Sequence, residues 1–191
     1  PEERLLRFSH TMPKLQEIDK REISCQWIRF SELLQRLREL AEMMEQTTGK
    51  RISVYHRQEL KTKQEEQEIL VDSECIQEVA ENLLNNAVRY AAQEILMQLE
   101  IHKNELTIYV KDDGSGFSQK ALRAAAEVYY SEEKNKERES NSNMEHFGIG
   151  LSICKMLCEN HNGGITFRNS VEGGAIVAAT FGIGNNSVFL K

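Results

Sequence analysis

Prolines and long apolar runs are scarce in this chain. Its 191 residues include two prolines, and its longest apolar runs, such as residues 175–181, fall far short of the roughly 18 residues that cross a bilayer. Gly/Ser-rich and single-residue tracts are missing, which argues against long disordered linkers. The sequence has no initiator Met and no signal-peptide pattern, so we expect it to be a piece of a longer protein.

Charge and cysteine content narrow the range of partners. The formal net charge of −6 disfavours nucleic acid or an anionic membrane surface as the main partner. An anionic ligand must therefore meet local positive charge, a metal ion or backbone N–H donors. Of the four cysteines, Cys154 and Cys158 lie one helical turn apart, but no second pair completes a zinc-ligand spacing. We expect all four to be reduced packing residues.

Residues 1–22 form a charged, amphipathic stretch. Its apolar positions are spaced alternately by three and four residues: Leu5, Phe8, Met12 and Leu15. This spacing predicts a narrow helical seam, kinked or restarted at Pro13. Two interpretations remain open, an exposed helical tail and the end of a dimerisation helix.

The remaining pattern alternates strands and helices. Period-two runs predict strands at residues 27–30, 51–56, 68–71, 94–102, 105–111, 165–169 and 175–181, with a hairpin turn at 103–104. Helices are predicted from Ser31, as N-cap, to Gly49, from Asp72, as N-cap, to about residue 92, and over 118–128 and 150–160. We expect residues 163–164, a glycine pair, to end the last helix. This order predicts an α+β fold with helices on one face of a mixed sheet.

The long helix after Asp72 carries an unusual polar stripe. Asn82, Asn86 and Arg89 lie at i, i+4 and i+7, on one face of a helix that is otherwise apolar. Because an amide buried without a partner costs about 1–3 kcal/mol, the stripe is expected to line a polar cavity or a ligand. A neutral amide oxygen also suits Mg²⁺ beside a polyphosphate. A solvated helix face is the alternative.

Two glycine-rich segments follow. The first, DDGSGF at residues 112–117, comes directly after a strand, and its glycines let the backbone approach a ligand while Asp112 presents an acceptor. A buried carboxylate can read adenine through its exocyclic amine, although a plain tight turn fits the same letters. The second, FGIGLSI at 147–153, is predicted to open a helix, where free N–H groups and the helix dipole favour phosphate.

Taken in this order, the segments resemble a known family. ENLLNNAVRYA, DDGSGF and FGIGLSI are similar to the N, G1 and G2 boxes of the histidine-kinase catalytic domain, within the gyrase, heat-shock chaperone, kinase and mismatch-repair ATPase superfamily. The resemblance covers residues 25–185 and implies a Bergerat-type two-layer α/β sandwich that binds Mg-ATP. It makes residues 1–24 the remnant of a dimerisation and phosphoacceptor hairpin, 186–191 a tail, and 131–147 an ATP lid.

The resemblance also implies roles for single residues. Asn86 takes the place of the magnesium ligand, and Asn82 and Arg89 complete the catalytic set. Asp112 takes the place of the adenine-reading acid, and Tyr90 stacks near the base. The implied nucleotide contacts are Asn86, Arg89, Tyr90, Asp112, Gly114, Gly116, Tyr130, His146, Phe147, Gly148, Ile149, Gly150 and Leu151. Tyr130 belongs to a looser match with a Phe-rich box, and the lid residues Lys134, Lys136 and Arg138 are candidates for phosphate contact.

One position separates the branches of the superfamily. In the hydrolysing members a Glu lies one helical turn before the magnesium ligand, where it activates water, whereas this chain has Asn82 there. Glu81 is rotated by about 100° around the helix from that position. An amide cannot serve as a general base, so we expect a poor ATPase. His10 is not expected to be the phosphate acceptor, because it lies only 17 residues before Trp27, too few for a helical hairpin.

The resemblance therefore implies transfer of the γ-phosphoryl group of ATP to a histidine on a dimerisation domain outside this sequence. The implied partners are that domain and a response regulator. The parent protein is expected to be membrane-anchored with this portion in the cytoplasm, and the fragment to be a monomer or weak dimer. An ATP-binding pseudokinase or sensor module is one alternative, and an ATP-hydrolysing clamp is another.

Overall fold

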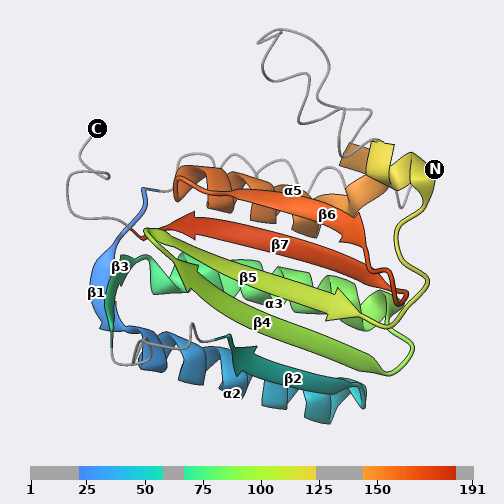
Figure 1. The fold of residues 1–191 in the computed structure, drawn as a ribbon, viewed down its shortest axis with the longest axis horizontal. Helices are drawn as coiled ribbons and strands as arrows, with labels where there is room; N and C mark the ends of the chain where they lie inside the picture. Colours follow the sequence, from blue (N-terminus) through green and yellow to red (C-terminus); the bar gives the residue numbers. More distant parts are fainter. Residues whose placement is uncertain (1–21, 58–66, 124–143, 184–191) are drawn as a thin grey trace, which may run out of the picture.

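A computed structural model describes residues 22–57, 67–123 and 144–183, with the backbone alone at 144–149. The main sheet has five strands in the order β2-β4-β5-β7-β6 (Figure 1). Their bounds are β2 Arg51–His56, β4 Glu94–His102, β5 Glu105–Asp112, β7 Ala175–Gly182 and β6 Gly164–Asn169. β2 runs parallel to β4, and the other neighbours are antiparallel.

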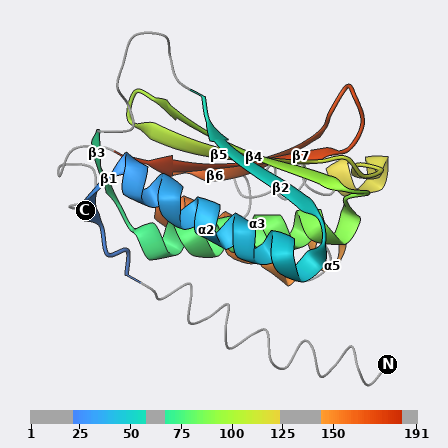
Figure 2. The same ribbon diagram turned by 90° about the horizontal axis from the view of Figure 1, so that it is seen from below.

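Three helices cover one face of this sheet: α2 Phe30–Thr48, α3 Ser73–Tyr90 and α5 Met144–Asn160 (Figure 2). A separate two-stranded ribbon pairs β1 Gln26–Arg29 with β3 Glu68–Val71. Apolar side chains from the helices and from alternate strand positions fill the space between the layers, among them Leu33, Leu37, Ile76, Leu83, Met97, Leu99, Ile108 and Phe181. The predicted α+β sandwich with helices on one face of a mixed sheet is confirmed.

The N-cap predicted at Ser31 is wrong, whereas the one at Asp72 is confirmed. α2 begins at Phe30, directly after β1, and no side chain caps it. The N–H group of Phe30 instead donates to the carbonyl oxygen of Gln67 at 2.9 Å, so this end of the helix takes a partner from the neighbouring chain segment. Asp72 accepts from the N–H group of Cys75 at 2.9 Å, and Gly49, with φ of +69°, ends α2 as predicted.

The start of α5 differs from the sequence prediction, whereas its end at Asn160 agrees with it. The helix begins at Met144, so Gly148 and Gly150 lie inside it and do not open it. Glycine lowers helix stability by only about 1 kcal/mol, which does not forbid a helix that packs on its neighbours. At the other end the left-handed residue is Asn162, with φ of +54°. Gly163 takes part in this helix end, because its N–H group donates to the carbonyl oxygen of Cys158 at 2.8 Å. A Cβ atom at Gly163 would also lie 1.8 Å from the carbonyl oxygen of Thr180.

Several predictions fall outside the described residues. Of the helix predicted at 118–128, residues 119–123 are helical, and the rest is not described. Also outside are the helical seam predicted at 1–22 except for residue 22, Tyr130, the lid residues Lys134, Lys136 and Arg138, and the tail at 186–191. Within the described part, none of the helices is long and apolar enough to span a membrane.

Candidate functional site

The polar stripe of α3 divides into an inner and an outer part. The Nδ2 group of Asn82 donates to the carbonyl oxygen of Glu78 at 2.8 Å, within the same helix. Its Oδ1 atom faces α5, where a Cβ atom added to Gly150 would lie 3.0 Å away. Asn82 therefore lies at a contact between α3 and α5, and Gly150 leaves room for its side chain there.

The outer part of the stripe is directed away from the core. Asn86 is half-buried, Arg89 is exposed, and the side chain of Tyr90 is 57 % exposed. Among the described residues none of these three side chains has a hydrogen-bond or ion-pair partner. An amide, a guanidinium and an aromatic ring are thus presented together at the C-terminal end of α3, where a ligand with phosphate and a flat ring can meet them.

Asp112 is the buried carboxylate of the site, with 4 % of its surface exposed. It is the last residue of β5, and its Oδ1 atom accepts from the N–H groups of Gly114 at 2.9 Å and of Ala175 at 3.3 Å. Both hydrogen bonds that join this carboxylate to other described residues fall on Oδ1. The second oxygen, Oδ2, is left to accept from a donor outside that set.

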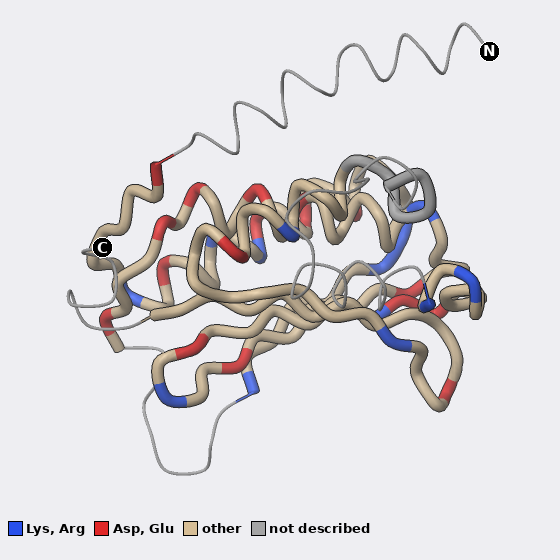
Figure 3. Tube along the Cα trace, turned by 90° about the horizontal axis from the view of Figure 1, so that it is seen from above, with Lys and Arg blue, Asp and Glu red and all other residues tan. Residues whose placement is uncertain are grey.

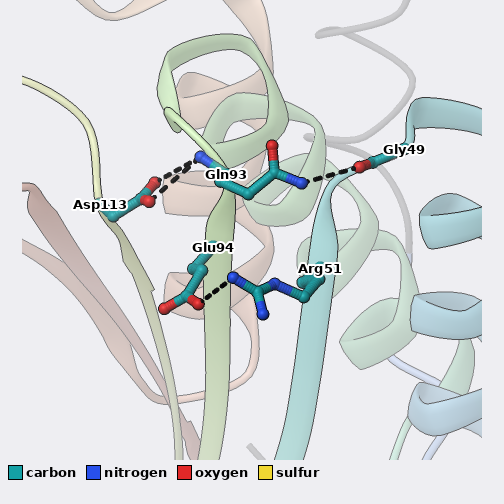
Figure 4. A network of polar contacts seen from close by, with 5 residues as sticks. All are labelled: Gly49, Arg51, Gln93, Glu94 and Asp113. Carbon is teal, nitrogen blue, oxygen red and sulfur yellow. Dashed lines mark hydrogen bonds and ion pairs between the residues drawn. The ribbon is translucent and has the colours of Figure 1, made fainter.

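The neighbouring carboxylate, Asp113, has a different task (Figure 4). Its two oxygens accept from the N–H group of Gln93 at 3.0 and 3.1 Å, and the side chain of Gln93 donates to the carbonyl oxygen of Gly49 at 3.2 Å. The N–H group of Gln93 stabilises the charged form and lowers the pKa of Asp113. Beside them, Arg51 and Glu94 form an ion pair. Asp113 therefore fixes the loop after α3, whereas Asp112 is buried and takes no part in holding that loop.

The acidic-glycine turn lies against the end of α3. A Cβ atom added to Gly114 would lie 2.2 Å from the carbonyl oxygen of Tyr90, so only glycine fits there. This contact brings Asp112 and the outer stripe of α3 into one region, as the sequence predicted for two motifs more than 20 residues apart.

The sequence predicted the two strands of the β6–β7 hairpin, but not the contacts by which this hairpin holds the turn. Asn169, at the end of β6, forms two hydrogen bonds with the backbone of Phe117, at 2.7 and 2.9 Å. Gly174 has φ of +81°, and a Cβ atom there would lie 1.8 Å from the carbonyl oxygen of Asp112. The glycine pair at 173–174 is a signal that could have pointed to this contact, but nothing in the sequence singles out Asn169.

The structure describes the side-chain positions of only some of the α5 residues that are predicted to contact the nucleotide. Gly150 lies beside Asn82, and Leu151 is buried. His146, Phe147, Gly148 and Ile149 lie in the first turns of α5, where the structure describes the backbone alone. Their contacts with a ligand remain predictions.

An open hollow of about 580 Å³ lies nearer the start of α3. It is lined by Glu74, Gln77, Glu78, Glu81, Asn82 and Asn85. It shares only Asn82 with the predicted set. Acidic residues recur along this helical layer (Figure 3), and the three glutamates at the hollow repel a triphosphate. The outer stripe and Asp112 therefore define the better candidate for the nucleotide site.

A two-layer sandwich with a polar stripe on its central helix and a buried carboxylate at the end of a strand defines an ATP-binding domain of the Bergerat type. Residues 71–184, more than half of the chain, match the family described as "Histidine kinase-, DNA gyrase B-, and HSP90-like ATPase". The chain belongs to this family, and within it to the ATP-binding domains of the histidine-kinase type. The resemblance seen in the sequence is thereby confirmed.

Curated relatives are sensor kinases. The chain is 31 % identical over 112 residues to the sensor histidine kinase SpaK of Bacillus subtilis, covering 58 % of this chain and 23 % of SpaK. It is 30 % identical over 122 residues to the sensor histidine kinase YvrG of Bacillus subtilis, covering 63 % of this chain and 20 % of YvrG. The matches thus span about a fifth of the length of these relatives.

Solved structures share the fold. The catalytic domain of histidine kinase ThkA aligns with a TM-score of 0.62 at 17 % identity, covering 84 % of this chain and 96 % of that one. Full-length ShkA in complex with AMPPNP aligns with a TM-score of 0.60 at 20 % identity, covering 86 % and 32 %. At these identities the likeness shows the fold alone.

Proposed function

We propose that this domain binds Mg-ATP at the end of α3 and passes its γ-phosphoryl group to a histidine on a dimerisation domain outside this sequence. The observation that carries the proposal is the buried carboxylate of Asp112, whose hydrogen bonds within the described chain all fall on one oxygen. The other oxygen suits the exocyclic amine of adenine. Tyr90, at the end of α3 against which this turn packs, offers a ring face for the base.

The outer stripe supports binding of the phosphates. Arg89 supplies a positive charge with several N–H donors and forms no ion pair with a described residue. The neutral amide oxygen of Asn86 fits as a magnesium ligand, because it is a hard donor, is half-buried and has no hydrogen-bond partner among the described residues. When bound, Mg²⁺ would neutralise part of the charge of the triphosphate.

The transfer needs no reactant besides ATP and the acceptor imidazole. The bond between the γ-phosphorus and the bridging oxygen of ATP breaks, a bond forms between that phosphorus and an imidazole nitrogen, and ADP leaves. The imidazole proton passes to a base beside the acceptor histidine, outside this sequence. This domain contributes orientation and charge neutralisation, which are the main sources of catalysis in phosphoryl transfer.

Water is a poor competitor for the phosphoryl group in this domain. Asn82 occupies the position of the water-activating carboxylate of hydrolases, and its amide is hydrogen-bonded within α3 and packed toward Gly150. Glu81 is exposed and lines the hollow. These positions favour a kinase over an ATP-hydrolysing clamp. By relation to sensor kinases, we further propose a response regulator as the downstream partner and a membrane-anchored parent protein.

Calorimetric titration of ATP, with and without Mg²⁺, tests the binding step. We expect micromolar to sub-millimolar affinity and negligible hydrolysis in a parallel ATPase assay. Asp112→Asn should abolish binding, whereas Asp113→Asn, which removes the same charge one residue away, should retain it. Micromolar affinity in Asp112→Asn would overturn the adenine assignment. Robust turnover would instead indicate a hydrolase.

The full-length parent protein tests the transfer step. Incubation with ATP labelled at the γ-phosphate should produce an acid-labile, base-stable phosphoprotein, as expected for phosphohistidine. Binding of ATP without any such label would identify a pseudokinase.

A further inference from the structure

We propose that Asn169 is a positioning residue for nucleotide binding, because its side chain clamps the end of the turn that carries Asp112. The inference rests on the proposed function, namely that this turn receives ATP. Asn169 lies 52 residues after Phe117 in sequence, on the edge strand β6, and sequence reasoning gave it no role.

The clamp has a donor and an acceptor on one side chain. The Oδ1 atom of Asn169 accepts from the N–H group of Phe117 at 2.7 Å, and its Nδ2 group donates to the carbonyl oxygen of Phe117 at 2.9 Å. The amide thus satisfies both polar groups of one residue, as a neighbouring strand would do. A carboxylate at position 169 has no donor at neutral pH and cannot reproduce this pair.

The turn is shaped to receive this amide. Gly116 has φ of +76°, and a Cβ atom there would lie 2.8 Å from the Oδ1 atom of Asn169. The ring of Phe117 packs edge-on against the ring of Phe167, also on β6, with 5.9 Å between ring centroids. β6 therefore contacts both the backbone and the ring of Phe117.

The same hairpin holds the other end of the turn. The N–H group of Ala175, at the start of β7, donates to Asp112, and Gly174 lies against the carbonyl oxygen of Asp112. The turn from Asp112 to Phe117 is thus attached at its start to β7 and at its end to β6. Loss of the Asn169 clamp removes the backbone part of the second attachment, so Gly116 loses its fixed position. Asp112 stays in place, and so does Gly114, whose N–H group donates to Asp112.

Asn169 contributes little to the core. It is exposed, and the only hydrogen bonds of its side chain to described residues are the two to Phe117. Its removal is therefore expected to leave the domain folded and to act on the turn. This separates a positioning role from a general effect on stability.

The test compares Asn169→Ala and Asn169→Asp with the wild-type chain by calorimetric titration of Mg-ATP. We expect Asn169→Ala to weaken binding by roughly tenfold, with an unfolding midpoint near that of the wild type. Asn104→Asp, an exposed amide in the β4–β5 hairpin, is the matched control and should bind as the wild type does.

Asn169→Asp adds a pH-dependent readout that a merely structural role would not move. At neutral pH its carboxylate can accept from Phe117 but cannot donate, so binding should weaken. On acidification the protonated carboxyl regains a donor, and the deficit relative to wild type should shrink. Other charged groups of the same loops, Asp112, Lys111 and Glu172, are present in both chains, so the ratio of variant affinity to wild-type affinity is compared at each pH.

Amide hydrogen exchange, measured without nucleotide, tests the Asn169 clamp separately from the proposed binding of ATP. In Asn169→Ala the amide of Phe117 should exchange faster than in wild type. Unchanged exchange would show that no clamp exists, and faster exchange with unchanged ATP affinity would show that the clamp does not position the site. Failure of the wild-type chain itself to bind ATP would overturn the proposed function, whatever the exchange rates show.

Discussion

The backbone N–H group of Asp72 donates to the Nε2 atom of His161 across 3.1 Å, and the imidazole is wholly buried. This hydrogen bond joins the first turn of α3 to the end of α5, the two helices that meet at Asn82 and Gly150. Ser24, in the segment that leads into β1, attaches to the same point, because its N–H group donates to Oδ2 of Asp72 at 3.0 Å. Three parts of the chain are thus fixed around one buried acid and one buried imidazole.

The stability of the domain should fall at mildly acidic pH because of His161. Burial lowers the pKa of His161 below its ordinary value of 6.5, although the nearby carboxylate of Asp72 opposes this shift. The folded state therefore binds fewer protons than the unfolded chain just below that value. The stabilisation is complete above pH 6.5 and is lost as pH falls toward the lowered pKa, with a limiting slope of about 1.4 kcal/mol per pH unit.

Urea denaturation at a series of pH values measures that slope. His161→Gln removes the titrating group and should flatten the decline, whereas His102→Gln, at an exposed position, should leave it unchanged. An equal slope in His161→Gln and in wild type would assign the acid sensitivity to other groups.

Asp72→Ala should destabilise the domain by about 1–2 kcal/mol, because α3 loses its N-cap and the N–H group of Ser24 loses its acceptor. Thermal or urea unfolding measures this cost. Glu74→Ala removes a carboxylate from the same turn without removing the cap, so it should cost markedly less. Equal losses of stability in the two variants would mean that the effect comes from negative charge near the helix dipole and not from the cap.

Gly150→Ala and Asn82→Ala should be coupled. An alanine at 150 places its Cβ atom 3.0 Å from the Oδ1 atom of Asn82, an atom of an amide already hydrogen-bonded to Glu78. Gly150→Ala should therefore destabilise the wild-type chain, but stabilise Asn82→Ala, where only the gain in helix propensity remains. A double-mutant cycle of unfolding free energies should give a coupling of about 0.5–3 kcal/mol. Additive effects would mean that the two helices do not meet here.

Gly174→Ala and Gly173→Ala separate backbone strain from steric clash. Both glycines have positive φ, +81° and +103°, so alanine is strained at either position. At Gly173 nothing lies within 4 Å of the added Cβ atom, whereas at Gly174 the carbonyl oxygen of Asp112 lies 1.8 Å away. Strain alone should cost about 1–3 kcal/mol, and Gly174→Ala should cost more and also weaken ATP binding. Similar losses for the two variants would contradict the contact with Asp112.

Much of this architecture could be predicted from local motifs in the sequence. Alternating apolar positions predicted the strands, because one face of each strand must be buried. Asp72 and Gly49 marked helix ends correctly, since their side-chain chemistry and conformational freedom act within a few residues. The order of the three motifs by itself indicated the family. The start of α2 was misjudged because the N–H group of Phe30 finds its acceptor in Gln67, 37 residues away in sequence.

The sequence by itself determined the strand and helix pattern, the residues of the polar stripe and the carboxylate at the end of β5. These depend on periodicity and on the chemistry of single side chains, which are local properties. Only the tertiary structure decided that Asp113 holds Gln93, that Asn169 holds Phe117, and that His161 meets Asp72. Each of these contacts joins residues that are close in space but distant in sequence, or depends on packing that the neighbouring elements impose.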